Sequence, residues 1–257
     1  MSEWTDIIDG IADHIALLRE LGASEIKLDP AVLAALDGKK PADASRPPTV
    51  SAPVPTSAQA SRPMPRPAPI VQSIPAAANL SALSSRINGC AACPLCTART
   101  ESPAIGTGNA ATPDVMFISD VPLAHEDLDL LHKMIGAMKY SPDDLYITSV
   151  CKCRPPAGRA PTQVEMTACM GILREHIRLL APKTIVLLGE VATKGIFSLT
   201  PQFKPQLNHW IKVNERHIMP IRHPSHLRRF PATKHDAWHA LQLVLAQLGR
   251  PLPPVKK

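Results

Sequence analysis

Between about residue 80 and residue 250, short apolar runs alternate with longer stretches whose apolar residues recur every three or four positions. Runs of five or six apolar residues are typical of strands buried on both faces of a parallel sheet, and the longer stretches are typical of the helices that cover it. The pattern therefore predicts an α/β fold of three layers, α/β/α, with a four-stranded parallel sheet. The predicted strands are 115–119, 145–150, 183–188 and 217–221, and the predicted helices are 128–138, 162–180, 190–197 and 233–248.

The chain before residue 80 has a different pattern. Residues 4–22 have apolar positions at helical spacing, and we expect an N-terminal helical segment there. A stretch rich in Pro, Ala and Ser follows without periodicity, and this composition predicts a disordered linker. A polyproline ligand for a partner protein is the alternative. The expected organisation is thus a helical segment at 1–38, a linker at 39–79, the α/β domain at 80–250 and a tail at 251–257.

The whole chain holds 28 Lys and Arg against 22 Asp and Glu, a formal charge of +6. A basic protein tends to bind polyanions, but a solvated basic surface explains this charge equally well. The acidic first residues do not fit a signal peptide, and no apolar run is long enough to span a bilayer. We therefore expect a cytoplasmic protein, whose thiols stay reduced. We also expect a monomer.

Six cysteines in such a protein indicate a metal or cluster site, or plain buried thiols, before disulfides. Cys90 and Cys93 form a C-x-x-C pair, whereas Cys153 follows a predicted strand and Cys169 lies in a predicted helix. Four such thiols can close one tetrahedral sulfur site around Zn or an iron–sulfur cluster, and the spacing hardly separates the two. The two cysteines left over, the first of which is an alternative ligand, are Cys96 and Cys151.

Polar segments follow three of the predicted strands. Because ligands bind at the carboxyl ends of parallel strands, we expect these segments to converge on one site. The segments are 119–122, 149–156 and 222–226.

Two side chains in these segments are candidates for catalysis. Asp120 can activate water or support a developing cation, with Pro122 fixing its turn, and its alternative role is a helix N-cap. His223 precedes a proline and can donate to a developing anion, and its alternative is a surface histidine. The basic residues around it suit a phosphate backbone, although such a run is also typical of a solvated loop. This basic stretch consists of His223, His226, Arg228, Arg229, Lys234 and His235.

Four segments carry a resemblance to a known family. They are Cys90-Ala91-Ala92-Cys93-Pro94-Leu95, Gly106-Thr107-Gly108-Asn109, Leu145 to Thr148 with Lys152-Cys153-Arg154-Pro155-Pro156, and His223-Pro224-Ser225-His226-Leu227. Together they resemble the iron–sulfur uracil-DNA glycosylases called family 4 and the phage DNA-polymerase-related proteins grouped with them.

The resemblance implies a hydrolase that flips uracil or another damaged base out of DNA and cleaves its N-glycosidic bond. It implies that Asp120 positions water and that His223 stabilises the charge on the departing base. It also implies a [4Fe–4S] cluster on the C-x-x-C pair, Cys153 and Cys169. The remaining implied contacts are Ser149 and Pro122 to the base, and Arg154, Ser225, His226, Arg228 and Arg229 to DNA.

The chain departs from the family pattern around the base. Residues 119–123 read Ser-Asp-Val-Pro-Leu where the family has Gly-Glu-x-Pro-Gly, no Pro-Phe-Val-Gly segment follows, and Ser149 replaces an Asn. Three hypotheses follow. The protein is a glycosylase with altered base choice, or an inactive DNA-binding relative with a structural cluster, or an interaction protein that the N-terminal helices and linker tether to a repair or replication partner.

Overall fold

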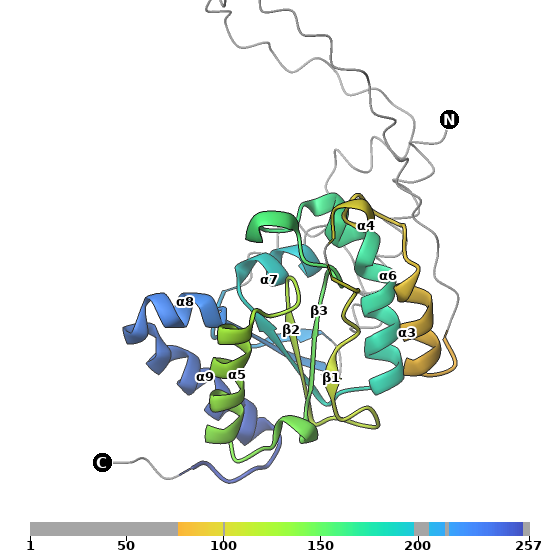
Figure 1. The fold of residues 1–257 in the computed structure, drawn as a ribbon. Helices are drawn as coiled ribbons and strands as arrows, with labels where there is room; N and C mark the ends of the chain where they lie inside the picture. The colour runs from red at the N-terminus through yellow and green to blue at the C-terminus, as the bar shows by residue number, and fades with distance from the viewer. Residues whose placement is uncertain (1–76, 100, 198–205, 214–215, 254–257) are drawn as a thin grey trace, which may run out of the picture.

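The computed structural model describes residues 77–99, 101–197, 206–213 and 216–253. The helical segment expected at 1–38, and the linker up to residue 76, lie outside the described residues. A central sheet is covered by α5 and α9 on one face and by α6 and α7 on the other, as Figure 1 shows. Within the part of the chain that the structure describes, no helix is both long and apolar enough to cross a membrane.

The sheet has six strands in the order β1-β3-β2-β4-β6-β5. Its four central strands pair in parallel, and they are the four that the apolar runs predict. The prediction of a purely parallel, four-stranded sheet is wrong, because an antiparallel strand is added at each edge. The edge strands have two and three residues, too few to show any periodicity. The strands are β1 (Thr107–Gly108), β2 (Val115–Ser119), β3 (Tyr146–Ser149), β4 (Thr184–Leu188), β5 (Ile211–Val213) and β6 (Arg216–Ile221).

Each central strand contributes to two hydrophobic cores, because successive side chains of a strand point to opposite faces. In β2, Val115 and Phe117 pack with α5 and α9, whereas Met116 and Ile118 pack with α6 and α7. All five residues of β2 are buried. Burying a side chain such as Phe117 contributes roughly 1.5–3 kcal/mol, so this strand anchors the residue that follows it, Asp120.

The long helix α6 (Gln163–Leu180) begins at the predicted capping box. The Thr162 hydroxyl accepts the Glu165 backbone N–H, and the Glu165 carboxylate accepts the Thr162 N–H at 2.8 Å. Arg159 donates two further hydrogen bonds to Glu165, and this contact holds the pKa of the Glu165 carboxyl below its usual range. The start of α6 is thus fixed firmly, and with it the position of Cys169, two turns further on.

Most remaining helices match the predictions, with shifted ends. Helix α5 begins three residues earlier than predicted. Helices α4 and α8 were not predicted because four and six residues are too few to show a periodic stripe. Helix α3 was also not predicted, although Leu80, Leu83 and Ile87 have helical spacing. The helices are α3 (Leu80–Asn88), α4 (Leu95–Ala98), α5 (His125–Ala137), α7 (Glu190–Phe197), α8 (Pro224–Arg229) and α9 (Lys234–Gln247).

Candidate functional site

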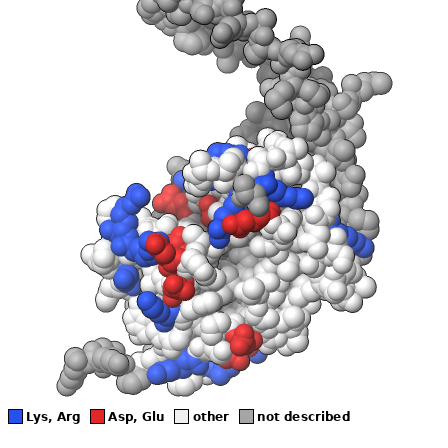
Figure 2. All heavy atoms as spheres, in the orientation of Figure 1, with Lys and Arg blue, Asp and Glu red and all other residues white. Residues whose placement is uncertain are grey.

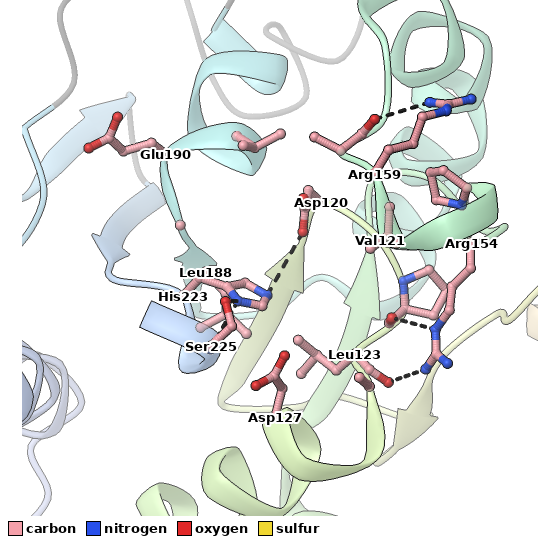
Figure 3. Close-up of a pocket in the computed structure, with 17 residues that line it drawn as sticks. Asp120, Val121, Leu123, Asp127, Arg154, Arg159, Leu188, Glu190, His223 and Ser225 are labelled. Carbon is pink, nitrogen blue, oxygen red and sulfur yellow. Dashed lines mark hydrogen bonds and ion pairs between the residues drawn. The ribbon is translucent and has the colours of Figure 1, made fainter. Parts of the chain in front are cut away.

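A cavity of about 610 Å³ lies at the carboxyl ends of the central strands (Figure 3). All three predicted segments supply lining residues, as do the loop after β4 and the start of α5. The structure therefore brings together the strand ends that the sequence singled out. The lining includes Asp120, Pro122, Asp127, Arg154, Gly189 and His223.

Asp120 and His223 face each other across this cavity (Figure 3). Asp120 follows β2 and His223 follows β6, and both strands pair with β4, which lies between them. The distance from His223 Nε2 to Asp120 Oδ1 is 3.9 Å. This gap is longer than a hydrogen bond, so each side chain keeps its polar atoms for a bound molecule.

The orientation of His223 follows from the start of α8. His223 is the N-cap of this helix, and its Nδ1 accepts the Ser225 backbone N–H at 3.2 Å. The Ser225 hydroxyl also lies 2.7 Å from Nδ1. Because Nδ1 is the acceptor, the neutral imidazole carries its proton on Nε2. Nε2 is buried and has no hydrogen-bond partner among the described residues, so its N–H is available to a ligand in the cavity.

Burial sets the charge of this histidine. Desolvation lowers the pKa of His223 below its ordinary value, although Asp120 and Asp127 act in the opposite direction. Burial also raises the pKa of Asp127, which the His223 ring partly offsets. His223 is therefore neutral near pH 7, with one N–H directed at the cavity.

Gly189 determines how closely β4 and His223 approach. Its φ is +93°, and a Cβ at this position would lie 3.0 Å from His223 Cβ. Only glycine adopts this conformation without strain, and only glycine leaves room for the imidazole. The sequence marks Gly189 as the end of a strand, but nothing in it reveals the contact with His223.

Gly189→Ala is expected to lower the free energy of unfolding by about 1–3 kcal/mol, because the new methyl group combines backbone strain with a clash. Thermal unfolding measures this loss. Gly136→Ala is the matched control, since no atom outside its own helix lies within 4 Å of a Cβ there. That control should be neutral or slightly stabilising. Equal melting temperatures for the Gly189 variant and wild type would contradict the close-approach argument.

Arg154 lies on the cavity wall and holds a turn of it in place. Its Nε donates to the Pro122 carbonyl at 3.1 Å, and its Nη2 donates to the Leu123 carbonyl. Glu101 is 3.8 Å from Nη1. The predicted contact of Arg154 with DNA thus has a competing role in shaping the turn after Asp120.

The predicted DNA-binding residues after His223 lie on α8, but they differ in exposure and in the contacts they already make. Arg228 pairs with Asp127 at 2.9 Å and with Glu126, so it ties α8 to α5. Figure 2 shows basic and acidic side chains next to each other on this side of the molecule. Ser225 and Arg229 are exposed, whereas the His226 ring packs on Phe230 with 4.8 Å between centroids. Phe230 itself is 50% exposed.

Only one of the two residues expected to contact the base lines the cavity. Pro122 lines the cavity, but Ser149 is absent from the lining. Ser149 is buried, and its hydroxyl donates to the Cys151 carbonyl at 2.7 Å. Among the described residues that line the cavity there is no Phe, Tyr or Trp.

The four candidate cluster cysteines lie near one another, beside the loop that follows β3. Cys90 and Cys93 lie between α3 and α4, Cys153 follows β3, and Cys169 is in α6. Burial raises the pKa of Cys93 to about 12, and the negative charges of Cys169, Cys153 and Cys90 add to this effect. Thiols packed so closely repel one another once ionised. A cationic centre among them relieves that repulsion.

An arginine supports this thiol group. Arg99 Nη1 donates to the Cys90 carbonyl at 3.2 Å and lies 3.8 Å from Cys153 Sγ. No three His, Cys, Asp or Glu side chains of the described chain are arranged to hold one metal ion. An all-thiol donor set of four suits either a structural zinc ion or an iron–sulfur cluster.

The two spare cysteines differ. Cys96 is half-buried in α4. Cys151 is fully buried and hydrogen-bonded to Cys169, to which the Lys152 backbone N–H also donates. The ammonium group of Lys152 is buried beside them, and burial lowers its pKa to about 7. The sequence analysis did not predict that Lys152 is buried beside the cysteines. Its position between Cys151 and Cys153 was the one sequence feature that pointed to this.

Comparisons with known proteins show the family to which the chain belongs. Residues 105–242, more than half of the chain, match the Uracil DNA glycosylase superfamily. The Type-4 uracil-DNA glycosylase of Thermotoga maritima is 32% identical over 162 residues, which are 57% of this chain and 82% of that protein.

Two archaeal relatives match a shorter part. The Type-4 uracil-DNA glycosylase of Sulfurisphaera tokodaii is 35% identical over 132 residues, 47% of this chain and 59% of its own length. That of Archaeoglobus fulgidus is 32% identical over 132 residues, 47% of this chain and 65% of its own length. The chain thus spans less than two thirds of these two proteins. By the family match and the Thermotoga relative, the chain belongs to the uracil DNA glycosylase superfamily.

Proposed function

We propose that the protein is a DNA-repair glycosylase that hydrolyses the N-glycosidic bond of uracil or another damaged base in DNA. The arrangement of Asp120 and His223 carries this proposal. A carboxylate and an unpartnered imidazole N–H face each other across a cavity at the strand ends of a chain in this superfamily. The relatives named above are glycosylases that act on uracil in DNA, by their names.

Each residue has a distinct part in this reaction. Breaking the glycosidic bond leaves positive charge on the sugar and negative charge on the base. Asp120 stabilises the cationic sugar and accepts a proton from the attacking water. Nε2–H of His223 donates to the oxygen on which the departing base gathers its charge. A neutral imidazole serves as this donor because Ser225 fixes its proton on Nε2.

The cavity and α8 together fit a flipped nucleotide. Its volume of about 610 Å³ lies within the range of small-molecule pockets, roughly 300–1,000 Å³. Ser225 lines the cavity, and Arg229 is exposed at the end of the same helix, where it can contact phosphates. The base enters the cavity while the backbone rests on α8.

The proposed cofactor is a [4Fe–4S] cluster held by Cys90, Cys93, Cys153 and Cys169. When bound, the cluster supplies a covalent tie between segments that are distant in sequence. The cysteines themselves join the chain before β1, the loop after β3 and the middle of α6. Since the Pro122 turn is held by Arg154, the neighbour of Cys153, the tie also steadies one wall of the cavity.

Two observations favour a second candidate, an inactive DNA-binding relative whose cluster is structural. No aromatic side chain of the described residues lines the cavity, so none is available to stack on a base. Ser149 occupies the position of the expected base-reading amide, and its hydroxyl is directed to Cys151 instead. In either case residues 1–79 remain a candidate tether to a repair or replication partner.

A single-turnover assay separates the two candidates. Single-stranded and duplex oligonucleotides carrying uracil or a deaminated purine are incubated with excess protein, and an oligonucleotide with thymine is the control. We expect excision of at least one damaged base and none of thymine. If no tested base is released while fluorescence anisotropy shows intact DNA binding, the glycosylase proposal is wrong and the inactive relative is supported.

A further inference from the structure

One carboxylate on the cavity wall has no part in the reaction proposed above. Asp127 lies in the first turn of α5, and its side chain points into the cavity beside His223 (Figure 3). The residue is only 7% exposed. A buried carboxylate is costly unless its oxygens are paired, so the contacts of Asp127 show what it can still bind.

Arg228 occupies one of the two oxygens of Asp127. Its Nη1 donates to Oδ1 at 2.9 Å, while its Nη2 pairs with Glu126 on the exposed side of α5. No described residue donates to Asp127 Oδ2. The arginine therefore fixes the carboxylate and offsets its charge, and it leaves one oxygen as an acceptor for a molecule in the cavity.

Most other charged side chains of the cavity wall are already engaged. Arg154 donates to two backbone carbonyls of the wall, and Arg159 donates to Glu165. Glu190, which is largely exposed, accepts from Lys194 at 3.1 Å. The polar atoms that remain free to read the edge of a base are therefore few.

His223 and Asp127 together offer a donor beside an acceptor. Nε2–H of His223 has no partner among the described residues, and the two side chains are close enough for the charge of each to affect the pKa of the other. Such a pair is complementary to a carbonyl oxygen next to a ring N–H. Uracil presents this edge as O2 and N3–H, whereas cytosine presents O2 next to a bare N3, whose lone pair would face the carboxylate.

We propose that Asp127 selects the base: its Oδ2 accepts the ring N–H that deamination of cytosine creates, while His223 donates to the neighbouring carbonyl. This inference rests on the proposed function and names the group that separates uracil from cytosine in it. Because Arg228 offsets the charge of Asp127, the carboxylate can hold N3–H while negative charge gathers on O2 of the departing base. Thymine carries the same edge, so its rejection depends on the space around the 5-methyl group and not on Asp127.

Asp127→Asn tests the inference, because it keeps the shape of the side chain and replaces one acceptor by a donor. Arg228 still donates to Oδ1, so the Asn carbonyl faces the arginine and its NH₂ group faces the cavity. This variant should lower the preference for uracil over cytosine by about 10²-fold. Glu126→Gln is the matched control, since Glu126 also pairs with Arg228 but does not line the cavity, and it should leave the preference unchanged.

Two measurements on the full-length protein give this preference. Single-turnover excision is followed on single-stranded oligonucleotides that carry one uracil, or one cytosine, at the target position. Fluorescence anisotropy compares oligonucleotides with 2′-fluoro-2′-deoxyuridine or 2′-fluoro-2′-deoxycytidine at that position, whose fluorine slows cleavage because it destabilises the cationic sugar. Binding thus reports base choice even without bond cleavage. Asp127→Ala, which removes both oxygens, should lose the preference without gaining cytosine, and circular dichroism melting of each variant excludes unfolding as the cause.

The outcomes separate this inference from the proposed function. If the wild type excises uracil and Asp127→Asn lowers the uracil and cytosine signals equally, the residue is only structural, and the inference is wrong while the proposed function stands. If the wild type excises nothing but binds 2′-fluoro-2′-deoxyuridine preferentially, and Asp127→Asn abolishes that preference, the inference stands and the glycosylase proposal is wrong. Equal binding of both analogues by a wild type that excises nothing would contradict both.

Discussion

Cys153→Ala is expected to abolish binding of the iron–sulfur cluster and to lower the melting temperature by roughly 10 °C. Cys153 is buried against Cys93 and Leu95, and it is the one proposed ligand that follows a strand of the sheet. Without it, the remaining thiols repel one another around an incomplete site. Loss of a metal tie is among the few single changes that cost about 4 kcal/mol or more, and 1 kcal/mol corresponds to about 2–4 °C in a domain of this size. Iron analysis, visible absorption and calorimetry on anaerobically purified protein measure both effects.

Cys96→Ala is the matched control for this change. Cys96 is only half-buried and belongs to the same short stretch as the C-x-x-C pair. We expect that variant to keep its iron and its melting temperature. If it loses iron while the Cys153 variant keeps it, the ligand set is wrong and Cys96 replaces Cys153. A colourless wild-type protein with stoichiometric zinc would contradict the cluster altogether.

His223→Ala is expected to slow base excision by about 10²–10³-fold, the usual effect of removing one donor to a developing anion. The loss should appear in the single-turnover rate, since the side chain acts on charge that develops only in the transition state. His223 also caps α8, so a stability loss has to be separated from a catalytic one. His223→Asn does this, because Asn caps helices well but places no imidazole N–H in the cavity. Both variants should lose the same activity, and the Asn variant should keep the wild-type melting temperature.

The pH dependence gives an independent test of the same residue. Because burial lowers the pKa of His223, wild-type excision should persist down to pH values below the ordinary imidazole pKa of about 6.5 and then fall. Protonation adds a proton to Nδ1, where the Ser225 N–H already donates, and it turns the 3.9 Å approach to Asp120 into an ion pair. Both changes leave the His223 imidazole and the Asp120 carboxylate less available to the substrate. An unchanged acidic limb in the residual activity of His223→Asn would assign that limb to another group.

The central strands were predictable because burial on both faces leaves a continuous apolar run, as in β2 and β4. The capping box of α6 was predictable because Thr162 and Glu165 are read from the sequence three residues apart. The edge strands were not, because two or three residues carry no period. Helix α8 was not predicted either, because six residues are too few to show a periodic stripe.

The candidate site shows the same division. The positions of Asp120 and His223 followed from strand ends, which are visible as changes from apolar to polar residues. The positions of Ser149 and Arg228 could not be predicted from the sequence. The Ser149 hydroxyl is directed to the nearby Cys151 carbonyl, and Arg228 pairs with Asp127, which is distant in sequence. Asp127 and Gly189 line the cavity without any distinctive sequence motif.

Strand β4 lies between β2 and β6, and this order limits which parts of the site can change during evolution. Strand spacing in a sheet is fixed by backbone hydrogen bonds at about 4.8 Å and hardly depends on side chains. The separation of the carboxylate and the imidazole is therefore inherited from the sheet, whereas the loops that contact a base can change length and sequence freely. The absence of an aromatic side chain from the described residues that line the cavity therefore leaves the spacing of Asp120 and His223 unchanged. If the proposed reaction is correct, base choice can change through the loops while the geometry for bond cleavage is kept by the sheet.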